Sequence, residues 1–238
     1  MWTCPPSRIL MPVDFSDASG RAVEVAVALA RRTDARVHLL HVEAIEVPAY
    51  FTAEQMKALE REQAVARSRA DGFLGEFATR HGASEFSTEI IEGLPTPTIV
   101  KAAGEADLVV MGTHGRRGPA LWWLGSVAER VIHESPAPVL VVRAVSSTPP
   151  EDVFRHPMLL AGEPTPEAPV ARVAAELAKA VGGEVVPTAA ACAADLAAER
   201  HASLIVLSSA ARHGTLLSHP AEQWLRSCSL PMLFVPKG

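Results

Sequence analysis

The sequence predicts an α/β fold with doubly wound parallel sheets, built twice in tandem in one chain of 238 residues. Short apolar runs of strand length alternate along the chain with segments whose apolar residues recur at helical spacing. A glycine-rich segment, residues 111–126, separates one such run from the start of a helix. The second half of the chain repeats the order of the first in reduced form.

The first predicted elements are a strand, a helix and a second strand. Residues 8–13 form a short apolar run, and the polar turn that follows carries Ser16 and Asp17, either of which can cap a helix. Apolar residues then recur at helical spacing between 18 and 32. Residues 36–42 are mostly apolar, which is typical of a parallel strand buried on both faces.

The rest of the first half continues the alternation. Thr52 and Gln55 form a capping box, which predicts a long charged helix that ends near Arg80. The remaining predicted elements are a strand at 84–91, a helix at 95–104, a strand at 107–111, a helix at 126–134 and a strand at 139–142.

Strands that alternate with helices imply right-handed crossovers and a parallel sheet. In the strand order 3-2-1-4-5, the first and fourth strands flank the point where the order reverses, and ligands bind beyond the carboxyl ends of the strands there. Val13 and Asp14 end the first strand, so they are expected to face the glycine-rich segment that follows the fourth strand.

That segment contains Gly112, Gly115 and Gly125, spaced by two and by nine residues, followed by the hydroxyl of Ser126. Glycine lets backbone N–H groups approach a phosphate closely, and a helix N-terminus adds unpaired donors and a positive dipole. The segment is therefore either a site for a nucleotide phosphate chain or simply a tight turn.

The repeat divides the chain into a first domain at 1–146, a linker at 147–156 and a reduced second domain at 157–238. In the second half, strands are expected at 158–161, 202–207 and 230–235, and a helix at 173–181. The positions that align with the glycines and the serine of the first half hold Ser208, Ala211, Ser218 and His219. We therefore expect the second domain to be degenerate and to hold no phosphate.

The composition of the chain argues against several classes of partner and binding site. A net charge of −5 and an aromatic content of 5 % argue against nucleic acid and anionic membranes as partners. The chain has neither an apolar run near the roughly 20 residues of a membrane helix nor an evident signal peptide, so a cytoplasmic location is expected. Cys4, Cys192 and Cys228 are expected to be free thiols, and the histidines show no metal-ligand spacing.

The chain resembles the nucleotide-binding branch of the universal stress protein family. The resemblance rests on Asp14 after the first strand, on the run 39–42, and above all on Gly112-x-x-Gly115-x9-Gly125-Ser126. It covers residues 8–143 well and is weaker over 156–236, so the whole resembles a tandem-domain member.

The resemblance implies ATP as the ligand, with or without Mg²⁺, and a set of site residues. By position, Pro12, Val13 and Asp14 border the adenine, Val42 lines the base or ribose, and Met111 and Gly112 lie under the ribose. The residues implied around the phosphates are Gly115, Arg116, Gly125, Ser126 and Val127. It also implies that the strands at 139–142 and 232–235 pair within the chain, and a homodimer is a further expected assembly.

Some of these residues have a simpler interpretation. Asp14 can serve only the local turn, Ser126 can be an N-cap, and Arg116 can be a solvated surface residue. For the whole chain, the favoured hypothesis is an ATP-binding stress-response module with slow or no hydrolysis, not an enzyme. The alternatives are a nucleotide-free interaction scaffold and an ATP-using enzyme of the nucleotide α-hydrolase class.

Overall fold

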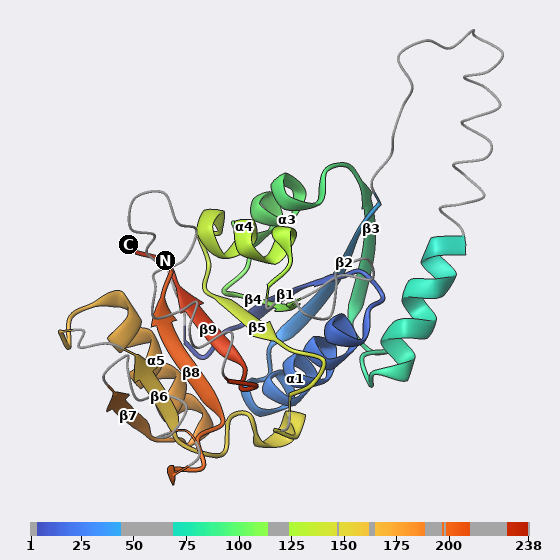
Figure 1. Cartoon of the computed structure of the whole chain (residues 1–238). Coiled ribbons are helices and arrows are strands. Elements are labelled where there is room, and N and C mark those ends of the chain that lie inside the picture. The colour runs from blue at the N-terminus through green and yellow to red at the C-terminus, as the bar shows by residue number, and fades with distance from the viewer. Residues whose placement is uncertain are drawn as a thin grey trace, which may run out of the picture.

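The computed structural model describes residues 4–43, 69–113, 124–146, 148–161, 165–188, 197, 199–209 and 228–237. Within these residues nine strands form one sheet in the order β3-β2-β1-β4-β5-β9-β8-β6-β7 (Figure 1). The strands are β1 Arg8–Val13, β2 Arg36–Glu43, β3 Ser87–Glu92, β4 Leu108–Gly112, β5 Val139–Val142, β6 Met158–Ala161, β7 Val185–Thr188, β8 Leu204–Ser208 and β9 Met232–Val235.

The described helices are α1 Asp17–Thr33, α3 Pro95–Ala103, α4 Ser126–Glu134, α5 Pro169–Val181 and the short 3₁₀ helix η1 Pro150–Asp152. Residues 69–80 are also helical, and they are the described end of the helix predicted over 52–80. The doubly wound α/β class and the strand order 3-2-1-4-5 of the first half are confirmed.

Several predicted boundaries differ from the structure by up to four residues, and one strand was not predicted. β3 begins at Ser87 instead of 84, because the N–H of Phe86 bonds the carbonyl of Ala83 in a turn. α5 begins at Pro169, four residues before the apolar repeat at 173–181 becomes evident, since proline is well suited to the first helical position. β7 was not predicted, because it is a four-residue edge strand that contains Pro187.

The pairing direction changes once in the sheet. The strands of the first group, β3, β2, β1, β4 and β5, are parallel to one another, and so are those of the second group, β9, β8, β6 and β7. β5 and β9 are antiparallel, with Leu140 opposite Leu233. The carboxyl ends of β6, β8 and β9 therefore lie at the edge of the sheet opposite to the carboxyl ends of β1, β4 and β5.

Both faces of the sheet are covered, as expected for parallel strands. α1 and α5 lie on one face, and α3 and α4 lie on the other (Figure 1). Alternate residues of a strand point to opposite faces, so Met11 of β1 packs toward α1 while Leu10 packs toward α3 and α4. This alternation decides which residues at the ends of the strands can meet.

A buried carboxylate fixes the opposite ends of β1 and β4. Oδ2 of Asp107 accepts hydrogen bonds from the backbone N–H and the hydroxyl of Ser7, at 2.9 and 2.7 Å, and from the N–H of Arg8 at 2.9 Å. Asp107 is 6 % exposed, and hydrogen bonds to a charged acceptor are stronger than neutral ones. The carboxylate therefore sets the register of the two strands that flank the switch point.

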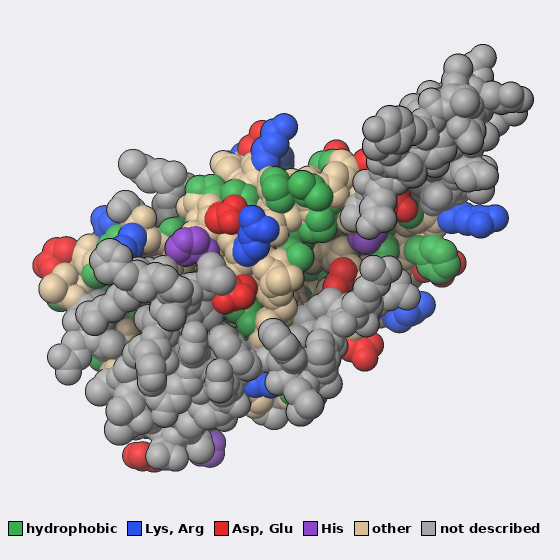
Figure 2. Space-filling model, turned by 45° about the horizontal axis from the view of Figure 1, so that its top comes forward, with side chains coloured by type: hydrophobic (Ala, Val, Ile, Leu, Met, Phe, Trp, Pro, Cys, Tyr) green, Lys and Arg blue, Asp and Glu red, His purple; other side chains and the backbone are tan. Residues whose placement is uncertain are grey.

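The visible surface carries mixed charge. On the face shown in Figure 2, the Lys and Arg side chains are scattered among Asp and Glu and do not form one basic patch. Within the described ranges, no helix has the length and hydropathy needed to cross a bilayer.

Candidate functional site

The hydrogen-bonded ladder between β1 and β4 is shorter than the strands themselves. Its pairs are Ile9 with Leu108 and Leu10 with Val109, whereas β1 stays paired with β2 as far as Val13. Pro12 lies in the unpaired stretch and has no N–H to donate. The carboxyl ends of the two strands are thus not bonded to each other at the switch point, where sequence reasoning placed the ligand.

The predicted residues at these ends divide between the two faces of the sheet. Met111 belongs to the apolar cluster under α3 and α4, and Val42 and Val127 pack against that cluster. By strand alternation Pro12 points to the same face. Val13 belongs instead to the cluster under α1. The structure therefore brings Pro12, Val42, Met111 and Val127 to one face, and Val13 and Gly112 to the other.

Gly112 has a packing role that the glycine pattern alone did not reveal. A Cβ atom at this position would lie 2.7 Å from the carbonyl carbon of Ala18 and 2.8 Å from the backbone nitrogen of Ser19. The first turn of α1 therefore rests directly on the backbone at the end of β4. Any side chain at residue 112 would push the helix away from the sheet.

The turn between β1 and α1 is built on Asp14. Its Oδ1 accepts hydrogen bonds from the N–H of Ser16 at 3.1 Å and from the hydroxyl of Ser16 at 2.6 Å. Ser16 is the N-cap of α1, and its Oγ accepts from the N–H of Ser19. The simpler, local role of Asp14 is therefore present in the structure. Among the described residues, Oδ2 of Asp14 accepts no hydrogen bond, which leaves it free for a donor on a ligand.

Phe15 holds this turn in an uncommon backbone conformation. Its φ is 63°, in the left-handed region that bulky residues rarely adopt. The ring packs against His41 at 4.5 Å and edge-on against Phe77 at 5.5 Å between centroids. Nδ1 of His41 lies 2.8 Å from the carbonyl oxygen of Val13, which fits a donated hydrogen bond in the tautomer protonated at Nδ1. Sequence reasoning missed these contacts, and an aromatic residue inside a polar turn was the one available signal.

A second histidine, His81, extends the ring contacts of Phe15 and Phe77 along α1. The ring of His81 lies 4.7 Å from that of Phe77, and it fills space that Gly20 leaves free by lacking a Cβ. Nδ1 of His81 is 3.0 Å from Oε1 of Glu24, whose other oxygen bonds Arg21 at 2.9 Å. Partial burial would raise the pKa of Glu24, but the hydrogen bonds and charges of His81 and Arg21 outweigh it and hold the pKa below its ordinary value.

The first turn of α4 lies at the end of β4. Gly125 is the N-cap, with φ −78° and ψ 152°, and it supplies no side-chain hydrogen bond. Its N–H donates to the carbonyl of Thr113 at 2.6 Å. Ser126 is therefore not the N-cap but the first, exposed residue of the helix. Within the described part of the chain, no side chain at the cap accepts a hydrogen bond from the N-terminal N–H groups of α4, which makes this turn suitable for an anion.

Gly115 and Arg116 lie outside the described residues, as does the whole stretch 114–123. The residues on either side of that stretch meet, since Thr113 accepts the hydrogen bond from Gly125. The described part of the predicted site therefore consists of Pro12, Val13, Asp14, Val42, Met111, Gly112, Gly125, Ser126 and Val127.

Comparison with known proteins identifies the family. The model of the universal stress protein family matches residues 6–143, more than half of the chain. The chain belongs to the universal stress protein family. A universal stress protein of Methanocaldococcus jannaschii is 36 % identical over 143 residues, which is 57 % of this chain and 81 % of that protein. Another, from Thermus aquaticus, is 39 % identical over 139 residues, or 57 % of this chain and 97 % of that protein.

One solved structure resembles this chain over both of its halves, and the resemblance of the second half is one of fold alone. The universal stress protein of Archaeoglobus fulgidus superposes with a TM-score of 0.74 at 18 % identity and covers 98 % of this chain and 99 % of that one. The arrangement of the second half of this universal stress protein therefore also occurs in another protein, at low sequence identity.

We predict that Gly112→Ala lowers the free energy of unfolding by about 1–3 kcal/mol, because the new Cβ would overlap the backbone of α1. Gly75→Ala is the matched control, since nothing lies within 4 Å of a Cβ built there. That control should leave stability unchanged or raise it slightly, as alanine is the better helix former. Urea unfolding of both variants measures the contrast, and equal stability of the two would contradict the packing role.

We predict that Glu24→Gln lowers stability at neutral pH by less than about 1 kcal/mol, because the ion pairs of Glu24 are partly exposed. The folded state depresses the pKa of Glu24, so its contribution is present above the unfolded-state pKa and is lost as pH falls through the folded-state value. Wild type and variant should thus converge in acid. Urea unfolding between about pH 3 and 7 tests this, with exposed Glu105→Gln as control. A stability gap as large at pH 3 as at pH 7 would refute it.

Proposed function

We propose that this universal stress protein binds ATP in its first domain and serves as a nucleotide-dependent stress-response module, with slow or no hydrolysis. The observation that carries the proposal is the first turn of α4, which has no side-chain cap and is tied by Gly125 to Thr113 at the end of β4. That end of the sheet also carries Asp14, with one carboxylate oxygen unused among the described residues. A helix N-terminus that can bind an anion and a carboxylate oxygen that can accept a hydrogen bond thus adjoin the same switch point.

The described residues fit the parts of ATP in turn. The apolar side chains of Pro12, Val42 and Met111, which share one face at the ends of three adjacent strands, suit the base and ribose. Oδ2 of Asp14 suits the exocyclic amino group of adenine. Ser126 and Val127 offer N–H groups and a hydroxyl for the phosphates, and Gly125, whose own N–H bonds Thr113, holds this turn at the end of β4. The sequence adds Gly115 and Arg116.

Mg²⁺, when present, would be held mainly by the triphosphate. Among the described residues, no group of three His, Cys, Asp or Glu side chains is placed to bind a metal ion. Asp14 is the carboxylate that follows β1 at the switch point, and Ser16 engages its Oδ1. We therefore propose binding with at most weak ATPase activity, because no described group is poised to activate a water molecule.

We further propose that the chain is a tandem duplication whose second domain is degenerate. Matched backbone hydrogen bonds support this: Thr113 N–H to Val142 O corresponds to Ser209 N–H to Val235 O, at 3.0 and 2.9 Å. β8 ends at Ser208 where β4 ends at Gly112. The halves at 1–146 and 157–238, joined by 147–156, would then bind one nucleotide per chain.

In this proposal the pairing of β5 with β9 within one chain replaces a pairing of the same kind between two chains. Their antiparallel pairing covers the free edge of β5, so a homodimer would have to use another surface. We propose a cytoplasmic protein whose ligand is an adenine nucleotide, with neither nucleic acid nor a membrane as partner.

Ser126→Glu tests the phosphate position. A carboxylate in the first turn should stabilise α4 through the helix dipole, yet it should repel the phosphates. We expect ATP affinity to fall at least about tenfold while the melting temperature of the free protein holds or rises. Ser126→Gln, which adds a side chain of similar size without charge, should lose much less.

Isothermal titration of wild type and both variants with ATP and with adenosine gives the measurement. Adenosine carries no phosphate, so its affinity should change little in Ser126→Glu. Unchanged ATP affinity in Ser126→Glu would contradict a phosphate site at α4. An equal loss for ATP and adenosine would also contradict it, since the effect would then not depend on phosphate.

A further inference from the structure

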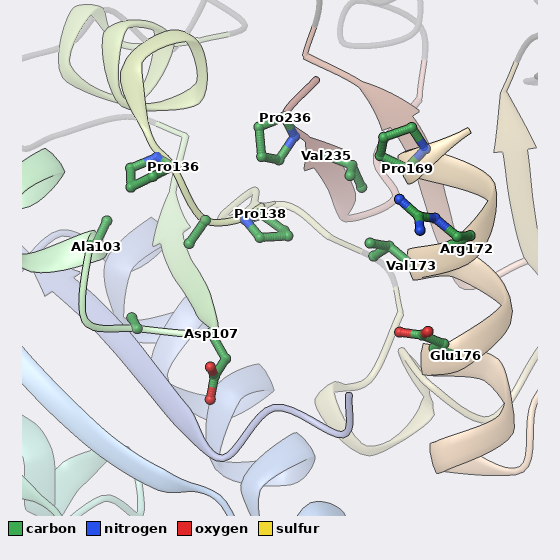
Figure 3. Close-up of a pocket in the computed structure, with 13 residues that line it drawn as sticks. Ala103, Asp107, Pro136, Pro138, Pro169, Arg172, Val173, Glu176, Val235 and Pro236 are labelled. Atoms are coloured by element: carbon green, nitrogen blue, oxygen red, sulfur yellow. The ribbon is translucent and has the colours of Figure 1, made fainter. Parts of the chain in front are cut away.

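A hollow lies at the edge of the sheet opposite to the proposed nucleotide site. Its volume is about 450 Å³, within the range of small-molecule sites. One wall is the turn before β4 and the turn before β5, and the other is the first two turns of α5 with the end of β9 (Figure 3). It therefore adjoins the amino ends of β4 and β5, whereas the proposed nucleotide site adjoins their carboxyl ends.

The hollow depends on both halves of the chain. Asp107 and Pro138 come from the part that matches the universal stress protein family, and Arg172, Glu176 and Val235 come from beyond it. The family model ends at residue 143, so Arg172, Glu176 and Val235 lie outside the matched part. A ligand here would be independent of ATP.

Four prolines and one buried hydrogen bond restrict the walls of this hollow. Pro136, Pro138, Pro169 and Pro236 all line the space, and proline restricts the backbone. Buried Ser135 fixes the turn before β5, since its hydroxyl donates to the carbonyl of Ala137 at 2.8 Å. A preformed pocket loses little conformational entropy on binding.

Two opposite charges project into this space from one helix. Figure 3 shows Arg172 and Glu176 of α5 pointing toward the proline-lined wall, with Val173 between them. Neither forms an ion pair with a described residue, and an arginine that precedes a glutamate by four residues is the less favourable order for pairing. Both charges are therefore available to a ligand.

Two other ionisable groups lie near Arg172 and Glu176. Oδ2 of Asp107 accepts hydrogen bonds from Ser7 and from the backbone N–H of Arg8, and Figure 3 shows its carboxyl group turned away from α5. Burial, with the charge of Glu176, raises the pKa of Cys4 to about 11, so this thiol stays neutral. The pocket thus offers one positive and one negative group above an apolar wall.

We propose that this pocket binds a free α-amino acid with an apolar side chain. The carboxylate would bind Arg172, the ammonium group Glu176, and the side chain the wall formed by Pro138, Val173 and Val235. A simple anion would be repelled by Glu176 and a simple cation by Arg172, whereas a zwitterion satisfies both. An apolar side chain gains by leaving water for the proline-lined surface.

The test uses the full chain and L-leucine as the probe. Two analogues each remove one charge: leucinamide lacks the carboxylate, and 4-methylpentanoate lacks the ammonium group. Isothermal titration or ligand-observed NMR should show leucine binding at millimolar concentrations or better, with each analogue weaker by at least about tenfold. No binding of leucine up to about 10 mM, or equal binding of an analogue, would overturn the proposal.

Variants then locate the site. Arg172→Gln and Glu176→Gln should each weaken leucine binding at least about tenfold. Lys179→Gln, an exposed charge on the same helix outside the pocket, should not. Leucine affinity unchanged in both pocket variants would overturn the assignment. ATP affinity should be equal in all three, so a failure of the ATP proposal would leave this result unaffected.

Discussion

The close approach of α1 to Gly112 is the contact on which the rest of the candidate site depends. With no Cβ on residue 112, the backbone of Ala18 and Ser19 can rest on the end of β4. That position of α1 fixes its N-cap, Ser16, and through Ser16 it fixes the carboxylate of Asp14. One missing methyl group therefore sets the distance between the turn after β1 and the end of β4.

Around this contact the turn after β1 is held in a conformation it would not adopt alone. Phe15 has a positive φ, which costs free energy, and its ring contacts with His41 and Phe77 offset that cost. Stored strain of this kind is common where a backbone must present groups to a ligand. The turn is thus shaped by side chains from β2 and from the helix at 69–80.

Much of the fold could be predicted because its signals are local. The apolar run of β4, the capped start of α1 and the alternation of strands and helices each follow from neighbouring residues. Pro187 hid β7, since a short edge strand with a proline has little β signal. The pairing of β5 with β9 was expected from the family resemblance but its antiparallel direction was not, because sequence pattern alone does not give the pairing of distant strands.

The candidate site could be predicted as a set of residues but not as an arrangement. The glycine spacing pointed to Gly112 and Gly125, yet their roles differ: one admits a helix, and the other caps a helix without a side chain. The contacts of His41 with Phe15 and Val13 join residues far apart in sequence, so no local pattern could reveal them. The pocket between α5 and β4 likewise arises from the packing of two halves of the chain.

The most direct test of a single working nucleotide site is the nucleotide content of the purified chain. Protein purified without added nucleotide is denatured, and the released adenine nucleotide is separated and quantified against protein concentration. We expect about one adenine nucleotide per chain, bound at the first domain alone. Two per chain would contradict the degenerate second domain. No released nucleotide, together with no rise in melting temperature on adding ATP, would contradict the site itself.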